Sequence, residues 1–254
     1  MSIELPRSVV LSLWLERIQL EGVGVLPDAL AAVQTGDEPH QVHGSPDLGL
    51  TLSDLAAQAT FCHAVLPVPG EPQAPAEAGQ VALEAGEALL VRTGAGTTAL
   101  VPQVHQFGSP WEPGSQVRWQ SISSSAVVPV PSSMSHARQE LAHGLEVAID
   151  TLTRIDVAKW REEDAEEIAQ LASCDVPPAI AAVLPPAVPP RQQDLLVRSA
   201  RLLAIVDLAT ADDGAAVNLW QADQRATAMR HVATTARRAM VAASAWAPQA
   251  STSR

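Results

Sequence analysis

The most regular pattern of apolar positions lies near the C-terminus, where apolar residues recur at alternating spacings of three and four. This spacing places them along one side of a long α-helix. Most of them are alanine, so a neighbouring helix can approach closely. The residues of this stripe, the alanine seam, are Leu219, Ala222, Ala226, Met229, Ala233, Ala236, Met240, Ala243 and Ala247. We expect the seam to be buried against a partner helix.

Three further helices are predicted before the seam. Helical spacing of apolar residues indicates helices at about 135–157 and 162–173. Residues 192–211 are apolar nearly all round, which is typical of an interior helix. A short turn at 212–214 joins this helix to the seam, so the two are predicted to pack as a helical hairpin. The sequence thus predicts an antiparallel C-terminal bundle of three to four helices.

The N-terminal half mixes helical and strand periodicity. Helical spacing predicts four helices, and apolar runs or strict alternation predict about four strands. The helices are expected at 7–20, 27–34, 53–60 and 76–85, and the strands at 61–66, 88–91, 98–104 and 116–122. The predicted fold class is therefore α+β, with a mixed α/β N-terminal domain followed by the helical bundle.

The boundary between these parts is predicted from composition. Residues 121–135 are rich in Ser, Val and Pro, which favours extended chain. We place a mixed α+β domain at 1–131 and a helical bundle domain at 132–247, followed by a flexible tail at 248–254. Residues 176–191 contain six prolines, which predict a connector without regular helix.

Charge and composition narrow the class of protein. The formal net charge is −12, and an acidic protein repels polyphosphates and anionic membranes. No run approaches the roughly 20 apolar residues that span a bilayer. Cys62 and Cys174 form neither a CxxC pair nor a disulfide framework, which fits a reducing compartment. We expect a soluble cytoplasmic protein, and the single lysine against fifteen arginines is typical of a high-GC bacterial genome.

One candidate metal site lies on the predicted helix at 135–157. Glu140 and His143 form a Glu-x-x-His pair, as in di-metal helical bundles, and His136 lies one turn before Glu140. The chain has no second Glu-x-x-His copy. The alternative is a solvated polar face opposite the apolar stripe of the same helix. The sequence therefore leaves open whether a metal ion binds here, and it predicts no other cofactor.

A second group of histidines offers a zinc hypothesis. His40 and His43 lie in a predicted loop, and His63 or His105 could complete a tetrahedral set from predicted strands. Cys62 is adjacent to His63 on one strand, so the two side chains point to opposite faces. The alternative is that these histidines are separate surface or core residues.

Basic residues flank the alanine seam. Arg230 and Arg237 are seven positions apart and lie on one edge of the helix. Without aromatic interleaving or a known motif, nucleic-acid binding is disfavoured. We predict that these arginines pair with acidic surface of the same chain or of a second copy.

The sequence contains no P-loop, dinucleotide fingerprint or nucleophile elbow. It favours a non-catalytic protein- or ligand-binding module, in which His105, Trp111 and Trp119 gather in a cleft between the two halves. The partner would be another protein or a second copy of the chain. A metal-dependent enzyme using Glu140 and His143 is the first alternative. A nucleic-acid-associated regulator using the C-terminal arginines is the second.

Overall fold

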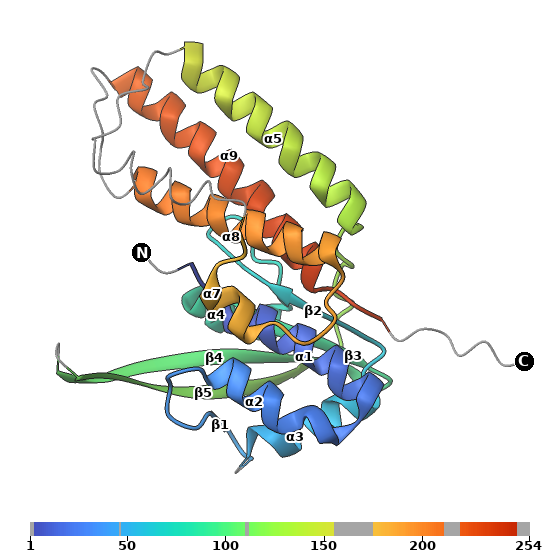
Figure 1. Ribbon diagram of the computed structural model, residues 1–254. Helices are drawn as coiled ribbons and strands as arrows, with labels where there is room; N and C mark the ends of the chain where they lie inside the picture. The colour runs from blue at the N-terminus through green and yellow to red at the C-terminus, as the bar shows by residue number, and fades with distance from the viewer. Residues whose placement is uncertain (1–2, 46, 110–111, 155–174, 211–218, 248–254) are drawn as a thin grey trace, which may run out of the picture. The chain divides into compact units, whose positions relative to one another are not determined.

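The structure is a computed structural model that describes residues 3–45, 47–109, 112–154, 175–210 and 219–247 (Figure 1). The described residues form a mixed α/β structure with a five-stranded sheet and eight α-helices. The helices are α1 (Arg7–Glu21), α2 (Leu26–Gln34), α3 (Leu48–Gln58), α4 (Ala76–Ala85), α5 (Met134–Arg154), α7 (Pro178–Val183), α8 (Pro190–Thr210) and α9 (Leu219–Ser244). The strands are β1 (Gln41–Val42), β2 (Phe61–Val65), β3 (Ala88–Thr93), β4 (Gly96–Ser109) and β5 (Glu112–Ser124).

The chain divides into two compact units. The sheet unit comprises residues 6–131, 182–187 and 244–254, and the helical unit comprises residues 1–5, 132–181 and 188–243. The chain therefore leaves the sheet unit at Pro131 and returns to it twice. Within the described residues, no helix is long and apolar enough to cross a membrane.

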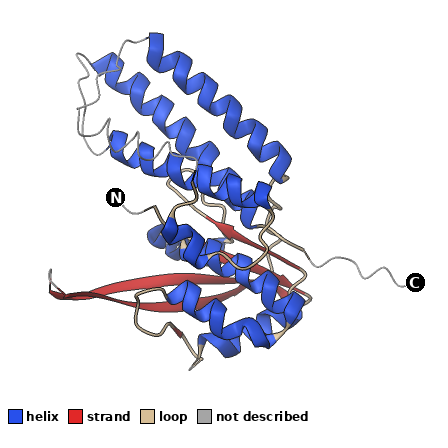
Figure 2. Ribbon diagram, in the orientation of Figure 1, coloured by secondary structure: helices blue, strands red, loops and turns tan. Residues whose placement is uncertain are grey.

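The strands, drawn in red in Figure 2, form one sheet with the order β1-β5-β4-β3-β2. Strands β2 to β5 pair antiparallel, and β1 pairs parallel with β5 through Gln41 and Val42. A two-residue turn joins β3 to β4, and the β4–β5 pairing runs without interruption from Thr97↔Ser124 to Ser109↔Glu112. The β4–β5 hairpin is therefore much longer than β2 and β3.

Helices cover both faces of the sheet. Helix α1 contacts β2, β3 and β4 on one face, and it also packs against α2 and α3. It is buried nearly all round, as expected for a helix that carries apolar residues on all sides. Helix α4 covers the opposite face, where Ala78 and Ala82 pack with Val65, Leu90 and Val101. These two layers form the core of the sheet unit.

The edge of β2 that faces away from β3 bonds to residues 244–246. The N–H of Cys62 donates to the carbonyl of Trp246 at 3.0 Å, and the N–H of Trp246 donates to the carbonyl of Cys62 at 2.9 Å. The N–H of Ala64 donates to Oγ of Ser244 at 3.0 Å, and the Trp246 indole donates to the carbonyl of Ser12 at 2.8 Å. Residues 244–246 thus complete the sheet unit.

Helices α5, α8 and α9 of the helical unit share one hydrophobic cluster. Ala148 of α5, Val206 of α8 and Met229 of α9 belong to it. A Cβ atom on Gly144 of α5 would come within 3.0 Å of the Thr235 side chain of α9, so these helices cross closely. The alanine seam is buried at Met229, Ala233, Ala236, Met240 and Ala243, and exposed at Ala226 and Ala247.

Several predicted elements differ from the observed ones. Helix α3 begins at Leu48, before the predicted start, because Asp47 Oδ1 accepts from the N–H of Gly49 at 2.7 Å and caps it. Strand β1 lies where the sequence predicts a loop. The predicted helix at 162–173 lies outside the described residues.

The prediction that prolines exclude regular helix from 176–191 is wrong at α7, which spans Pro178–Val183. Pro178 occupies the first helical position, where no backbone N–H is needed. Ile180 and Val183 are buried and provide the packing that fixes this short helix. Proline therefore sets where this helix begins.

Candidate functional site

The three predicted metal ligands on α5 lie in two separate pairs, and Glu146, which is outside the predicted set, completes the second pair. His136 Nε2 lies 3.5 Å from Glu140 Oε1, and His143 Nδ1 lies 4.0 Å from Glu146 Oε2. The side chains of His136 and His143 are 60% and 76% exposed. Across the described part of the chain, no three His, Cys, Asp or Glu side chains come together as a metal site would require.

The four histidines of the zinc hypothesis have different environments. His40 and His63 are 4% and 3% exposed, and His43 and His105 are exposed. His63 lies on the face of the sheet that carries Val65, the face covered by α4.

Of the three residues predicted to gather in a cleft, Trp111 lies outside the described residues. Trp119 is fully buried. His105 pairs with Gln116, and Trp119 pairs with Pro102. Because directly paired residues share a face and neighbours alternate, His105 and Trp119 lie on opposite faces of the hairpin. The structure does not bring these two side chains together.

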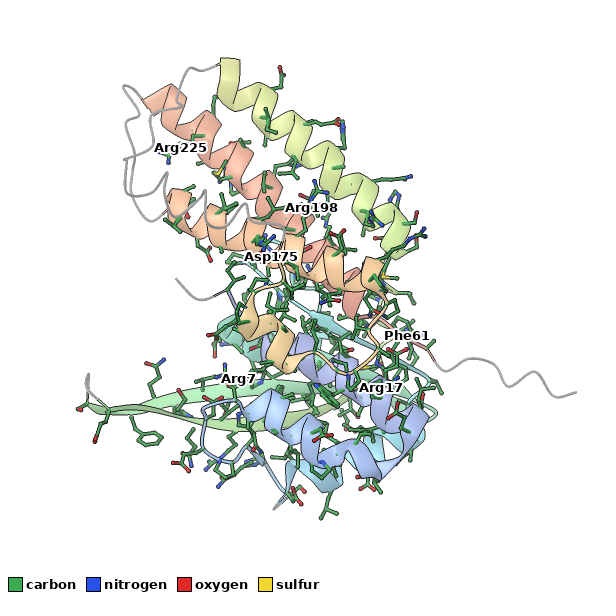
Figure 3. The ribbon with its side chains drawn as sticks, viewed as in Figure 1. Arg7, Arg17, Phe61, Asp175, Arg198 and Arg225 are labelled. Atoms are coloured by element: carbon green, nitrogen blue, oxygen red, sulfur yellow. The ribbon has the colours of Figure 1, made fainter. Side chains whose placement is uncertain are left out.

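The arginines beside the alanine seam bond threonines of their own helix, and the charge of Arg237 also acts on Asp207 of α8. Arg230 Nη2 donates to Thr227 Oγ1 at 3.0 Å, and Arg237 Nη2 donates to Thr234 Oγ1 at 3.2 Å. Nearer the start of α9, Arg225, which is labelled in Figure 3, donates from Nη2 to the carbonyl of Ala209 on α8 at 2.8 Å.

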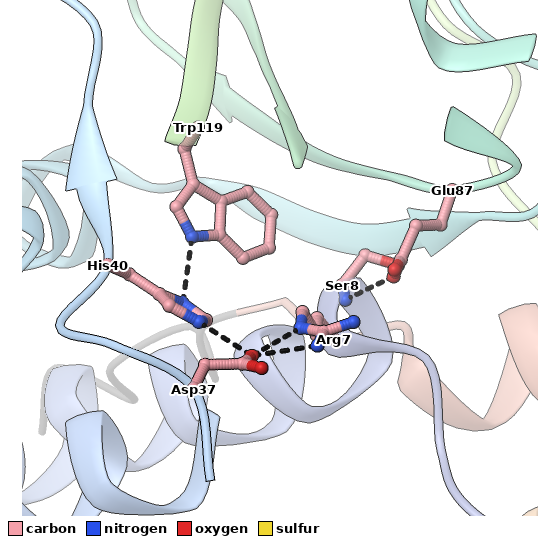
Figure 4. A network of polar contacts seen from close by, with 6 residues as sticks. All are labelled: Arg7, Ser8, Asp37, His40, Glu87 and Trp119. Carbon is pink, nitrogen blue, oxygen red and sulfur yellow. Dashed lines mark hydrogen bonds and ion pairs between the residues drawn. The ribbon is translucent and has the colours of Figure 1, made fainter. Parts of the chain in front are cut away.

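A buried chain of polar contacts crosses the sheet unit (Figure 4). Nε and Nη2 of Arg7 donate to Oδ2 of Asp37 at 3.0 and 2.7 Å. The same oxygen lies 3.1 Å from Nε2 of His40. On the other side of the ring, Nε1 of Trp119 lies 3.2 Å from Nδ1 of His40. This chain connects the start of α1 to β5.

The contacts assign the proton on His40. An indole N–H can only donate, so Nδ1 of His40 accepts from Trp119 and Nε2 carries the proton that is donated to Asp37. Burial lowers the pKa of His40, and the hydrogen bond and charge of Asp37 partly oppose this effect. The imidazole is held as the neutral Nε2-protonated tautomer.

A neighbouring contact fixes the N-terminus of α1. Pro6 supplies no side-chain cap, and Oε2 of Glu87 accepts from the N–H of Ser8 at 2.7 Å instead. Burial raises the pKa of Glu87, and the contacts with Ser8 and the charge of Arg7 lower it in part. Sequence spacing could not reveal these partners, because Ser8 and Glu87 are 79 positions apart.

The polar chain is suited to holding α1 against the sheet. The side chain of His40 is fully buried and that of Asp37 is 8% exposed, so neither faces solvent. Arg7 is the member that reaches the surface, at 29% exposure. We therefore assign this set of polar contacts a structural role.

A different feature is open to a partner: the outer edge of β4, defined as residues Pro102 to Phe107. Strand β3 pairs with β4 only from Gly96 to Leu100. In the described residues, no backbone hydrogen bond from another segment reaches the outer edge of β4. Figure 1 shows the hairpin continuing past the ends of β2 and β3.

The opposite edge of the hairpin is covered. The N–H of Glu38 donates to the carbonyl of Ser115 at 2.9 Å, and the N–H of His43 donates to the carbonyl of Trp119 at 2.8 Å. Alternate residues of β5 thus turn to that edge, and the residues between them turn to β4. By the same alternation, Val104 and Gln106 of β4 turn both N–H and C=O to the outer edge.

The side chains from Val104 to Phe107 are exposed, and the whole edge contains no Asp, Glu, Lys or Arg. Val104 is 41% exposed and Phe107 is 52% exposed. Residues 88–139 contain one acidic residue, Glu112, although the whole chain has 28. Of the residues with which natural proteins protect unpaired strands, the edge lacks lysine and contains one proline, Pro102.

Comparison with known families covers almost the whole chain. The model for the N-terminal domain of Rv1486c-like protein matches residues 8–134, and the model for its C-terminal domain matches residues 135–241. No curated protein and no solved structure matches the chain significantly.

Proposed function

The chain belongs to the Rv1486c-like protein family, and we propose that it is a non-catalytic protein-binding module that accepts an extended strand along the outer edge of β4. The observation that carries this proposal is the unpaired backbone at Val104 and Gln106 in an exposed strand. An extended segment can add to such an edge by main-chain hydrogen bonds, while alternate side chains provide specificity.

The side chains beside this edge favour protein over other ligands. Exposed apolar groups at Val104 and Phe107 give a partner strand surface to cover. The Phe107 ring lies across Gly114 of β5, where a Cβ atom would come within 2.6 Å of it. One side of the ring therefore packs against the backbone of β5, and the rest of the ring is exposed to solvent. The low local charge matches the depletion of charged residues in interface cores.

The titratable groups of the sheet unit support binding rather than catalysis. Burial raises the pKa of the Cys62 thiol to about 12, so this sulfur stays protonated at neutral pH. His40 and Asp37 are buried and bonded to each other within the chain of polar contacts. We propose a reducing, cytoplasmic setting, because Cys62 is a free thiol in the described part of the chain.

The helical unit serves, in this proposal, as scaffold. We propose that α5, α8 and α9 belong to an antiparallel bundle of three to four helices whose close packing depends on the alanine seam. The supporting observations are the shared hydrophobic cluster and the close crossing at Gly144.

The test uses a substitution that removes one outward donor. Gln106→Pro deletes the N–H that faces the outer edge and leaves the β4–β5 hydrogen bonds, which use the alternate residues. Gln106→Ala keeps the N–H and is the matched control. Random dodecapeptides displayed on phage are selected against the full chain at low protein concentration.

We expect selected peptides to slow amide hydrogen exchange at Val104 and Gln106. Their affinity should fall at least about tenfold for Gln106→Pro and stay unchanged for Gln106→Ala, because a strand partner loses a main-chain hydrogen bond. Peptides that bind the proline variant and the wild type equally would place binding elsewhere and overturn the proposal.

A further inference from the structure

We infer that the strand accepted by this edge is β4 of a second copy of the chain, paired antiparallel about a two-fold axis at His105. This inference rests on the proposed function and names its partner. The two outward-facing residues, Val104 and Gln106, lie one position on either side of His105. A two-fold axis there places each opposite the other in the second copy, and each pair exchanges both N–H···O bonds.

Neighbouring registers are worse for backbone reasons. An axis at Val104 places Gln106 opposite Pro102 of the second copy, which has no N–H to donate. An axis at Gln106 places Val104 opposite Gly108 of the second copy. The φ angle of Gly108 is +91°, outside the extended region of a regular strand, so its backbone does not continue the outward alternation of Val104 and Gln106. In the register centred on His105, Val104 and Gln106 pair only with each other, and Pro102 lies opposite Gly108 of the second copy at the ends of the paired segment.

The side chains fit this register. His105 turns its backbone groups toward β5, so the two copies of His105 form a non-hydrogen-bonded pair with close side chains. Phe107 lies opposite Gln103 of the second copy, which covers part of a ring that is 52% exposed in the single chain. Val104 lies opposite Gln106 on the other face. Every cross-strand contact is thus apolar or uncharged, apart from the histidine pair.

Charge explains why self-pairing is possible in an acidic chain. Two copies with a net charge of −12 each repel one another over most approaches. Strand β4 carries no Asp, Glu, Lys or Arg, and its hairpin partner β5 carries one arginine, Arg118, and one acid, Glu112. The edge is therefore a surface along which two copies can meet without facing carboxylates. A single pair of edge strands buries little area, so the dimer is weak and depends on concentration.

The first test traps the register. In a full-length chain with Cys174→Ser, His105→Cys is oxidised with glutathione disulfide. A non-hydrogen-bonded pair has its Cα atoms about 4.5 Å apart, within the roughly 4.4–6.8 Å that a disulfide spans. Gln103→Cys is the matched control, because its two copies would be about 14 Å apart in the same dimer. We expect a covalent dimer for His105→Cys and little for Gln103→Cys; equal trapping overturns the register.

The second test measures association without crosslinking. Sedimentation equilibrium should show an average mass that rises with concentration for the wild type and Gln106→Ala. For Gln106→Pro the association constant should fall at least about tenfold, because two donors are lost per dimer. A wild-type chain that stays monomeric throughout overturns the self-pairing. If that monomer still binds selected peptides at Val104 and Gln106, the proposed function stands; if it does not, both fail.

Discussion

His63 is a buried titratable residue whose imidazole is only partly satisfied. It lies on β2 and is 3% exposed, and its Nδ1 has no hydrogen-bond partner in the described residues. The centre of its ring lies 5.2 Å from the centre of the Phe61 ring. The guanidinium carbon of Arg92 lies 5.5 Å from the centre of the same Phe61 ring. Burial, and to a smaller extent the charge of Arg92, lowers the pKa of His63 to about 4. The ring is therefore neutral in the folded protein near neutral pH.

This lowered pKa predicts a loss of stability in acid. Between pH 6.5 and 4 the unfolded chain binds a proton at His63 that the folded chain does not, so the free energy of unfolding falls as the pH falls through this window. The contribution is complete above pH 6.5, and a pKa that folding lowers from 6.5 to about 4 corresponds to about 3 kcal/mol. Urea unfolding across this range should show a shallower decline for His63→Leu than for the wild type.

The control for this prediction is the exposed His43. His43→Gln removes an exposed imidazole and keeps the backbone hydrogen bond to Trp119, so it measures what the loss of a surface histidine does to the same profile. Parallel pH profiles for His63→Leu and the wild type would contradict the assignment of the acid loss to His63.

Residue roles were predictable from the sequence only where periodicity decides them. The alternation around Trp119 predicts a strand, and the structure confirms it as part of β5. The partner of the indole, His40, is 79 positions away and follows no spacing rule. The same holds for Arg7 and Asp37. Polar contacts between distant segments depend on the fold, so the buried polar chain could not be derived from local pattern.

Among the elements, α1 and α4 were predicted to within one residue because glycine and proline mark their ends. Gly86, at the C-cap of α4, has a left-handed φ of +73°, which suits glycine and ends the helix. The strand count was too low because β1 has two residues and pairs in parallel, which leaves no periodicity to detect. The outer part of β4 was missed because its side chains are exposed and show no apolar alternation. The predicted domain boundaries stay a prediction.

The alanine seam makes an element-scale prediction. Ala233 is 7% exposed and belongs to the cluster shared with α5 and α8. Ala233→Leu inserts bulk into this packing and should lower the free energy of unfolding by about 1 to 3 kcal/mol. Ala226 is on the same stripe but exposed. Ala226→Leu should change stability by less than about 0.5 kcal/mol, because alanine and leucine have similar helix propensities.

Denaturant unfolding followed by circular dichroism measures both variants. Similar stability for Ala233→Leu and Ala226→Leu would mean that the seam does not pack closely at Ala233. The contrast between two positions on one stripe separates packing from helix propensity, which a single variant cannot do.

At the scale of the whole molecule, the sheet unit depends on residues from the far end of the chain. Ser12 and Trp246 are 234 positions apart, yet the indole of Trp246 donates to the Ser12 carbonyl. Contacts of such sequence separation form only after a large loss of chain entropy. We therefore expect residues 244–246 to dock late in folding and the outer edge of β2 to be exposed before they do. Such an edge is a template for pairing with other chains.

Trp246 tests this dependence. It is 6% exposed, and Trp246→Ala should lower the free energy of unfolding by about 3 to 5 kcal/mol, the range for truncating a buried aromatic side chain. Trp246→Phe keeps a ring and loses one hydrogen bond, so it should cost only about 1 kcal/mol for that bond, plus the difference in ring size.

Hydrogen exchange provides the local readout, since the amides of Cys62 and Ala64 donate to Trp246 and Ser244. Relative to the wild type, Trp246→Ala should increase the exchange rates of these two amides more than those of the amides that pair β4 with β5. Uniform acceleration would indicate global destabilisation instead, and no acceleration would mean that residues 244–246 do not hold the edge of β2.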